Sequence, residues 1–261
     1  MAKTPSSALR DQPPAAQSDW AYFIDFDGTL VEIAATPDAI VVDAALPALL
    51  AELHRSCAGA VALISGRSLS DLERHIVLPT LPKAGQHGLE GRDAAGSLWR
   101  HAASPSSRQA ILAALVPVID AHSGLLLEDK GMTLAVHYRQ APQLASFVGE
   151  LMQRLVAEIA PDLVVQSGKC VVEIKPARVN KGTAVVRYLG EPPFFGRRPV
   201  FIGEDRTDQD GFAAVKARGG VSIGVGDDDL GADYRLADVA AVRAWLAGAC
   251  SRAAEGTAGA R

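Results

Sequence analysis

Short apolar segments alternate with amphipathic segments in two stretches of the chain, and this alternation constrains the fold more than any other feature of the sequence. In the first stretch, brief apolar runs at 21–25, 60–64 and 82–86 predict buried strands, with helices between them at about 44–57 and 68–76. The second stretch predicts a helix at 180–189, a strand at 199–202, a helix at 208–217 and a strand at 220–224. Strands that alternate with helices favour parallel βαβ units, so we expect both stretches to share one α/β sheet.

The middle of the chain follows a different pattern. Residues 125–139 predict a hairpin that turns at Lys130-Gly131, residues 142–159 a helix, and residues 163–176 a second hairpin that turns at Ser167-Gly168. Hairpins beside a helix indicate a small α+β insert. The predicted boundaries are a core of 19–104 and 175–248, an insert of 105–174, and flexible tails without periodicity at 1–18 and 249–261.

The bulk composition limits the possible functions. The chain has 261 residues, 48% of them hydrophobic, and its net charge of -4 argues against nucleic acid or an anionic membrane as a partner. The cysteines are far apart and form no C-x-x-C pair, which favours reduced thiols over a zinc cluster; they are Cys57, Cys170 and Cys250. Because no secretory signal or bilayer-spanning run is recognisable, we expect a soluble, cytoplasmic protein, and we expect it to be a monomer.

Acidic side chains follow the expected strands. The segments FIDFDGT (23–29), VALISGRS (61–68) and VFIGEDRTDQD (200–210) each run from a strand into polar residues, and the carboxyl ends of strands in an open α/β sheet bind ligands together. The acids expected to meet there are Asp25, Asp27, Glu204, Asp205 and Asp208. So many carboxylates require a divalent cation with oxygen ligands, for which Mg2+ is the natural choice.

A phosphate site is expected at the same edge of the sheet. Ser65-Gly66 leads into a helix and offers a hydroxyl and backbone N–H groups, and Lys181 begins another helix with an ammonium that suits charged oxygens. A cation beside a phosphate indicates phosphoryl transfer. The motifs of other hydrolase and nucleotide-binding classes, G-x-S-x-G, G-x-x-x-x-G-K-[ST] and H-E-x-x-H, are missing.

The order of these motifs resembles a known family. D-x-D-G-T (25–29), S-G-R (65–67), Lys181 and G-[DE]-D-x-T-D (203–208) resemble the four motifs of the haloacid dehalogenase (HAD) superfamily. Longer segments most closely resemble the trehalose-6-phosphate phosphatase family: GQHGLEGR (85–92), EDKGMTLAVHYR (128–139), GKCVVEIKPARVNKG (168–182) and IGEDRTDQDGF (202–212). The resemblance implies a Rossmann-like HAD core with an inserted α+β cap, and Mg2+-dependent hydrolysis of trehalose 6-phosphate in the last step of trehalose biosynthesis.

The resemblance also implies catalytic roles. Asp25 would attack the phosphorus to give an aspartyl-phosphate, and Asp27 would act first as general acid and then as general base. Lys181 would stabilise the charged transition state. The residues that would bind the phosphate are Thr29, Ser65 and Gly66.

The metal ligands implied by the resemblance include one departure from the family pattern. Asp25 and the backbone carbonyl of Asp27 would bind Mg2+ together with an acid of the fourth motif. Glu204 stands where aspartate is common, so either Glu204 or Asp205 would be the ligand, with Glu204 favoured, while Asp208 would orient bound waters.

The sugar would be bound by polar residues of the cap. Lys169 and Glu173 lie on one face of an extended segment and suit sugar hydroxyls. Lys130 is also a candidate for sugar binding, but a lysine before Gly131 fits simple hairpin-turn chemistry as well. By resemblance to the family, the other substrate-binding candidates are Arg67, His87, Glu90, Glu128, Lys130, His137 and Arg139.

Two alternatives stay open at the level of the sequence. One is a HAD phosphatase or phosphomutase for a different sugar phosphate, such as glucose 6-phosphate or sucrose 6-phosphate. The other is a catalytically silent sugar-phosphate sensor or a regulatory partner of a synthase, for which Glu204 leaves room and against which Asp25, Asp27 and Lys181 weigh.

Overall fold

The computed structural model describes residues 12–34, 39–101, 104–168 and 170–258, and the chain divides into two compact units. Unit 1 comprises Met1–Trp99 and Asn180–Arg261, and unit 2 comprises Arg100–Val179.

Unit 1 is built on an eight-stranded, mainly parallel sheet in the order β12-β11-β10-β1-β2-β3-β4-β5. Its strands are β1 (Ala21–Ile24), β2 (Val61–Ile64), β3 (Lys83–Gly85), β4 (Glu90–Arg92), β5 (Leu98–Arg100), β10 (Pro199–Gly203), β11 (Val221–Val225) and β12 (Tyr234–Leu236). In the register, Ile24 of β1 pairs with Ile202 on one side and Leu63 on the other, so the carboxyl ends of these strands lie level. The sheet confirms the predicted α/β class.

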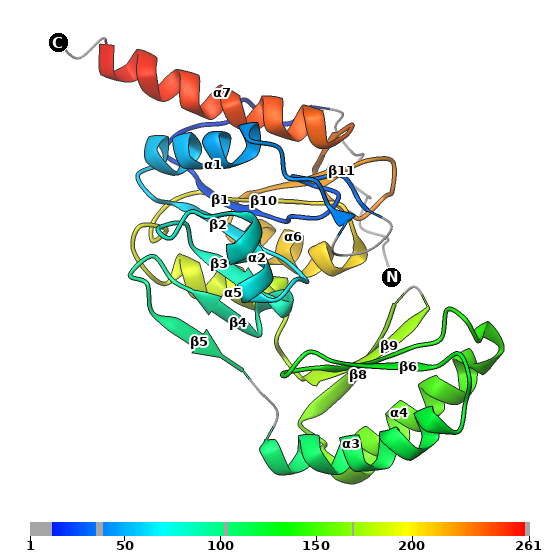
Figure 1. Ribbon diagram of the computed structural model, residues 1–261. Helices are drawn as coiled ribbons and strands as arrows, with labels where there is room; N and C mark the ends of the chain where they lie inside the picture. The colour runs from blue at the N-terminus through cyan, green and yellow to red at the C-terminus, as the bar shows by residue number, and fades with distance from the viewer. Residues whose placement is uncertain (1–11, 35–38, 102–103, 169, 259–261) are drawn as a thin grey trace, which may run out of the picture. The chain divides into compact units, whose positions relative to one another are not determined.

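Helices cover both faces of this sheet (Figure 1). The helices α1 (Ala45–Ser56) and α7 (Val239–Ala258) lie on one face, α5 (Lys181–Leu189) and α6 (Gln209–Lys216) lie on the other, and the short α2 (Leu69–His75) follows β2. Alternation along β1 explains both layers, because Tyr22 and Ile24 join one core cluster while Phe23 joins the second. The site at the end of β1 is therefore supported from two cores.

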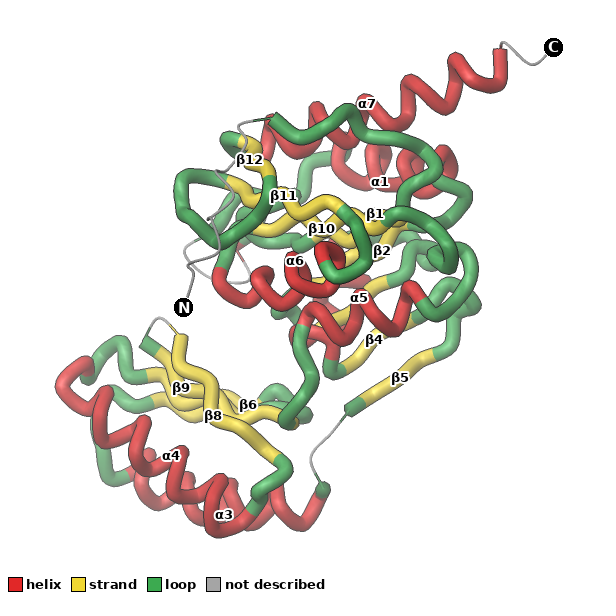
Figure 2. The backbone as a smooth tube through the Cα atoms, turned by 180° about the vertical axis from the view of Figure 1, so that it is seen from behind, coloured by secondary structure: helices red, strands yellow, loops and turns green. Residues whose placement is uncertain are grey.

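Unit 2 is an antiparallel four-stranded sheet, in the order β6-β7-β9-β8, with two helices on one face (Figure 2). Its elements are α3 (Pro105–Asp120), β6 (Leu126–Asp129), β7 (Leu134–His137), α4 (Ala145–Ile159), β8 (Leu163–Gly168) and β9 (Val171–Pro176), with a 3-10 turn at Pro142–Leu144 before α4. Leu134, Val136 and Ile174 pack with Ile111 and Val148 of the helices. The alternate side chains of β7 and β9 therefore lie on the other face.

Several predicted boundaries need correction. The second hairpin does not turn at Ser167-Gly168, because β8 continues through Gly168 and the turn includes Cys170, whose φ is 62°. Strand β9 runs to Pro176, past the expected boundary at 174/175. Helix α3 was not predicted, since Pro117 interrupts its helical pattern, but burial of Ile111 and Leu115 outweighs that local cost.

The predicted tails are also shorter than expected. Pro14 accepts a hydrogen bond from Trp245 Nε1 at 3.0 Å, and Gln17 exchanges two bonds with the Tyr22 side chain, so the part of 1–18 that the structure describes packs on the core. The expected tail at 249–261 is helical up to Ala258, because the alanine-rich sequence favours continuation of α7.

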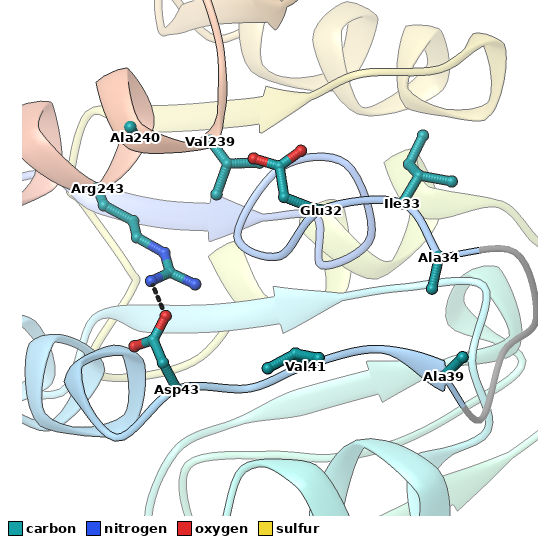
Figure 3. Close-up of a pocket in the computed structure, with 9 residues that line it drawn as sticks. All are labelled: Glu32, Ile33, Ala34, Ala39, Val41, Asp43, Val239, Ala240 and Arg243. Carbon is teal, nitrogen blue, oxygen red and sulfur yellow. Dashed lines mark hydrogen bonds and ion pairs between the residues drawn. The ribbon is translucent and has the colours of Figure 1, made fainter.

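The turn that follows β1 is fixed by its own backbone and by a distant arginine. Gly28 has φ +70° and donates to the Val31 carbonyl at 2.7 Å, which closes the turn. Arg243 of α7 donates from Nε and Nη2 to the Leu30 carbonyl at 2.9 and 2.7 Å, and it also pairs with Asp43 (Figure 3). Arg243 thus connects the last helix to the segment that carries Asp25 and Asp27.

Figure 3 also shows the cavity beside this arginine. Its volume is about 520 Å³, and its lining includes Glu32, Ile33, Val41, Asp43 and Val239 as well as Arg243. The Arg243 guanidinium is directed at Asp43 and at the Leu30 carbonyl, so its main effect is on the turn after β1.

Replacing Arg243 should destabilise this turn. Arg243→Met removes both hydrogen bonds to the Leu30 carbonyl, and we expect the free energy of unfolding to fall by about 1–3 kcal/mol in urea titrations. Arg218, which donates to the Ala214 carbonyl at an exposed site, is a matched control, and Arg218→Met should cost less than about 0.5 kcal/mol. Equal effects of the two substitutions would contradict the prediction.

Candidate active site

A buried lysine joins two buried carboxylates at the carboxyl edge of the unit 1 sheet. Lys181 Nζ lies 2.8 Å from Asp25 Oδ1 and 2.7 Å from Asp208 Oδ1. All three side chains are at most 5% exposed. Lys181 is the first residue of α5, and the side chain of Asn180 caps this helix by accepting a hydrogen bond from Thr183 N at 2.9 Å. The structure thus brings together three residues that the sequence placed in the candidate site.

The buried charges shift one another's ionisation. Burial raises the pKa of Asp25 to about 6, against the opposing effect of the Lys181 ammonium. Burial and the nearby Asp25 carboxylate raise the pKa of Asp208. Burial alone would lower the pKa of Lys181, but Asp25 and Asp208 raise it above its ordinary value, so the lysine stays charged.

The loop after β10 wraps around Asp208. Asp208 Oδ2 accepts hydrogen bonds from Glu204 N at 2.9 Å and Asp205 N at 3.0 Å. A Cβ on Gly203 would lie 2.2 Å from Asp208 Cγ, so only glycine fits there. Asp205 Oδ1 accepts from both N and Oγ1 of Thr207 as the 3-10 turn Arg206–Asp208 begins. Hydrogen bonds within the loop thus hold the carboxylates of Asp205 and Asp208 in place.

Glu204 differs from the other acids of this loop. No hydrogen bond or ion pair ties its carboxylate to another residue of the ranges described, and its side chain packs over Gly28, where an added Cβ would lie 2.5 Å from Glu204 Cγ. Burial, together with Asp205 and Asp208, raises the pKa of Glu204 to about 7. Glu204 is therefore the acid of this loop whose oxygens are best available to a cation.

The carboxylates of this site suit a hard divalent cation in their chemistry, although their oxygens are not grouped around one position. Within the described residues, no group of three or more His, Cys, Asp or Glu side chains stands ready to hold a metal ion. The acids that converge are Asp25, Asp27, Glu204, Asp205 and Asp208, against the cations Lys181 and Arg67. An excess of carboxylate oxygens is the chemistry that Mg2+ and similar ions prefer.

Of the predicted phosphate-binding residues, Thr29 lies beside Asp25, and Ser65 and Gly66 follow the neighbouring strand β2. Thr29 Oγ1 is 3.4 Å from Asp25 Oδ2, and both Thr29 and Ser65 are buried. Ser65 follows β2, and its carbonyl accepts a hydrogen bond from His87 N at 2.9 Å. A Cβ on Gly66 would lie 2.8 Å from the His87 ring, so His87 covers the backbone of this loop. His87 belongs to the 3-10 turn Gln86–Gly88 and has φ 59°.

Arg67 is bound by Asp27. Its Nε and Nη2 donate to the two carboxylate oxygens of Asp27 at 2.8 and 2.7 Å, and its Nη1 donates to Asp71 at 2.6 Å. The sequence predicts Arg67 as a substrate contact and does not single out Asp71. Asp71 lies four residues after Arg67, at the start of a predicted helix, and this spacing could have identified it as a partner of Arg67.

Glu90 has a supporting role in the same region. Its carboxylate is buried and accepts hydrogen bonds from Leu69 N at 2.9 Å and Gln86 Nε2 at 3.2 Å. It therefore joins the start of α2 to the 3-10 turn that follows β3.

Unit 2 carries a separate polar network on the sheet face opposite its helices. Glu173 accepts hydrogen bonds from Thr133 Oγ1 at 2.6 Å and Lys130 Nζ at 3.3 Å, and His137 Nε2 lies 2.8 Å from Glu128 Oε2. Thr133 was not predicted, because it stands just before a strand and has no distinguishing pattern. Arg139 is exposed after β7, and Lys169 lies outside the described residues.

Comparisons with known proteins identify the family. The family model for trehalose-phosphatase matches residues 23–240. The chain belongs to the trehalose-phosphatase family. The members of this family are phosphoric monoester hydrolases, so the match confirms the resemblance seen in the sequence and supports a divalent-metal requirement in general terms.

Individual relatives of this chain support the same family assignment. The chain is 44% identical over 208 residues to the probable trehalose-phosphate phosphatase of Sinorhizobium fredii (strain NBRC 101917 / NGR234), covering 80% of this chain and 78% of that protein. It is 42% identical over 235 residues to the trehalose-6-phosphate phosphatase of Escherichia coli (strain K12), covering 90% and 88%.

Solved structures confirm the fold of this family member. The C-terminal domain of C. albicans trehalose-6-phosphate phosphatase matches with a TM-score of 0.74 at 23% identity, over 90% of this chain and 93% of that one. A phosphatase of the HAD superfamily from Bacteroides thetaiotaomicron matches with a TM-score of 0.59 at 15% identity, over 90% and 96%. Within the described residues, no helix is both long and apolar enough to cross a membrane.

Removing the Lys181 ammonium should leave two buried carboxylates uncompensated. Lys181→Met is expected to lower the free energy of unfolding by about 3–5 kcal/mol at neutral pH, with chelator present so that no cation replaces the ammonium. Lys216, which pairs with Asp233 at the surface, is the control, and Lys216→Met should cost no more than about 1 kcal/mol.

The loss at Lys181 should also depend on pH. The pKa of Asp25 is already raised to about 6 in the folded chain, so the folded state holds a proton that the unfolded state releases, and stability falls as pH rises through that window. Without the ammonium this window extends upward, so the gap between variant and wild type should widen from about pH 5 to about pH 8. A gap that is constant across this range would contradict the assignment.

Proposed function

We propose that this chain hydrolyses trehalose 6-phosphate to trehalose and phosphate, the last step of trehalose biosynthesis. The observation that carries the proposal is the buried bridge from Lys181 to Asp25 and Asp208, which holds the Asp25 carboxylate beside an ammonium and so supports its role as a nucleophile in phosphoryl transfer. The relatives named above, at 42–44% identity, support the same substrate.

The first chemical step transfers the phosphoryl group to Asp25. An Asp25 oxygen attacks phosphorus while the bond from phosphorus to the sugar oxygen breaks, and the electron pair of that bond stays on the sugar oxygen. Asp27 gives its proton to this oxygen as the sugar leaves. Lys181 keeps Asp25 ionised and in place, since its ammonium favours the carboxylate.

The second step releases phosphate. Water attacks the phosphorus of the aspartyl-phosphate, Asp27 takes a proton from that water, and the bond from phosphorus to the Asp25 oxygen breaks. Asp25 is then restored as a carboxylate. The hydroxyls of Thr29 and Ser65 and the Gly66 backbone are proposed to bind the phosphate oxygens, and the position of Thr29 Oγ1, 3.4 Å from Asp25 Oδ2, supports this.

We propose Mg2+ as the metal, because the donor set consists of oxygens and has more carboxylates than cations. Asp25, the Asp27 carbonyl and Glu204 would hold it, with Asp205 as an alternative to Glu204, and Asp208 would support them. When bound, the metal neutralises phosphate charge. Glu204 is preferred because Asp205 and Asp208 are already engaged with backbone N–H groups.

The polar network of unit 2 is proposed to bind the sugar. Glu173 and Glu128 offer carboxylate oxygens to hydroxyls, and Lys130 offers an ammonium. His87, Arg139 and Lys169 remain proposed contacts on the strength of the family resemblance. We further propose a cytoplasmic monomer that binds neither nucleic acid nor membrane, from its net charge of -4 and its composition.

The nucleophile and the metal should both be indispensable. We expect phosphate release from trehalose 6-phosphate to stop when a chelator is added and to resume with Mg2+, and to fall at least about 1,000-fold in Asp25→Asn. Asp120→Asn, at the exposed end of α3, is the control and should keep full activity. Faster release from glucose 6-phosphate or sucrose 6-phosphate would assign another substrate, and no turnover at all would favour a silent sensor.

Sugar recognition should be separable from phosphate chemistry. In Glu173→Gln the lost charge weakens a hydrogen bond to a sugar hydroxyl, so kcat/KM for trehalose 6-phosphate should fall roughly 10- to 100-fold. Hydrolysis of p-nitrophenyl phosphate, which has no sugar, should change little. Glu150→Gln on the exposed side of α4 is the control. Equal losses on both substrates would argue against a sugar contact at Glu173.

A further inference from the structure

Arg67 engages both oxygens of the Asp27 carboxylate. Its Nε lies 2.8 Å from Oδ2 and its Nη2 lies 2.7 Å from Oδ1, the parallel two-bond geometry that fixes a carboxylate most firmly. The Arg67 side chain is 8% exposed, whereas that of Asp27 is 34% exposed. A ligand that enters the site therefore has access to Asp27 and very little to Arg67.

Further contacts hold the Arg67 guanidinium in place. Arg67 Nη1 donates to Asp71 of α2 at 2.6 Å, and the guanidinium carbon lies 5.9 Å from the centre of the Phe26 ring. The backbone is fixed as well, since Arg67 N donates to Ser65 Oγ at 3.2 Å and Arg67 O accepts from Gln86 N at 2.7 Å. Moving Arg67 toward a sugar would break several of these contacts together.

We propose that Arg67 is a positioning residue that sets the orientation of Asp27 for proton transfer, and that it is not a sugar contact. The inference rests on the proposed function in that Asp27 must exchange a proton with the leaving group. Arg67 orients the Asp27 carboxylate by its two bonds, Asp71 orients Arg67, and the exposed side of Asp27 stays open to the reacting oxygen.

The chemistry of the first step makes this role measurable. When Asp25 attacks, the bond from phosphorus to the leaving oxygen breaks and the proton moves from Asp27 to that oxygen. A leaving group that is stable as an anion needs this proton much less. Nitrophenolate is more stable than phenolate, so misplacing Asp27 should slow hydrolysis of phenyl phosphate more than hydrolysis of p-nitrophenyl phosphate.

The test compares these two aryl phosphates, which have similar shapes and no sugar. Arg67→Lys keeps the charge but cannot form the two-bond pair. We expect kcat/KM for phenyl phosphate to fall about 100-fold and that for p-nitrophenyl phosphate less than about 5-fold, because general acid catalysis typically contributes a factor of this size. Values of kcat/KM are used because they report the first transfer, before the aspartyl-phosphate is hydrolysed.

Matched variants separate positioning from other effects. Arg74 also pairs with Asp71 but lies at the surface, so Arg74→Lys should change neither substrate. Asp71→Asn weakens the support of Arg67 without touching Asp27 and should give a smaller loss, about 5-fold, again larger for phenyl phosphate. In Asp27→Asn the additional change Arg67→Lys should have almost no effect on phenyl phosphate, since the two residues act through one interaction.

The outcomes distinguish the alternatives. If both aryl phosphates slow equally in Arg67→Lys, the arginine has only a general structural role and the inference is wrong. If only trehalose 6-phosphate is affected, through KM, Arg67 is a sugar contact after all and the inference is wrong. If Arg67→Lys does not fold, an equal effect of Asp71→Asn on both aryl phosphates overturns the inference, and the unequal effect described above supports it.

The same measurements distinguish a failure of this inference from a failure of the proposed function. A wild-type protein that hydrolyses both aryl phosphates but not trehalose 6-phosphate would remove the proposed sugar substrate while leaving Arg67 testable. A wild-type protein that hydrolyses none of the three would overturn both.

Discussion

The site depends on one buried positive charge shared by two buried carboxylates. A charged group away from water is tolerated only when it is paired and hydrogen-bonded, so Lys181, Asp25 and Asp208 require one another. They come from the end of β1, the start of α5 and the loop after β10, and their mutual attraction fixes the relative positions of those segments. The geometry of the candidate site in unit 1 is in this sense an electrostatic consequence of burial.

Two glycines allow the acidic loops to approach so closely. Gly203 leaves room for the Asp208 carboxylate, and Gly28 leaves room for Glu204. The backbone N–H groups of residues 204 and 205 then neutralise part of the Asp208 charge. Glu204 has no such partner within the described parts of the chain, which is why the loop combines two engaged acids with one that suits a cation.

The two aspartates of the first motif differ because their surroundings differ. Asp25 is buried against the Lys181 ammonium. Asp27 is partly exposed, and both of its carboxylate oxygens accept hydrogen bonds from the Arg67 guanidinium. Arginine suits that position because its planar fork matches a carboxylate, while a lysine could only offer a point charge. The cations around them thus suit two residues of the same type to the separate tasks proposed for them, one as nucleophile and one in proton transfer.

Much of this was already determined by the sequence. The alternation of apolar and amphipathic segments specified the α/β layers, because burial requires it, and the polar residues after 21–25, 60–64 and 199–202 specified which edge of the sheet carries the site. Local patterns did not reveal α3, whose Pro117 opposes a helix, or the helical end of α7. Only the tertiary structure decided that Arg67 binds Asp27 across 40 positions of chain, that Thr133 supports Glu173, and that Glu204 is left without a protein partner among the described residues while Asp205 and Asp208 are engaged. Those choices depend on distances between segments far apart in the sequence, and no local pattern contains such distances.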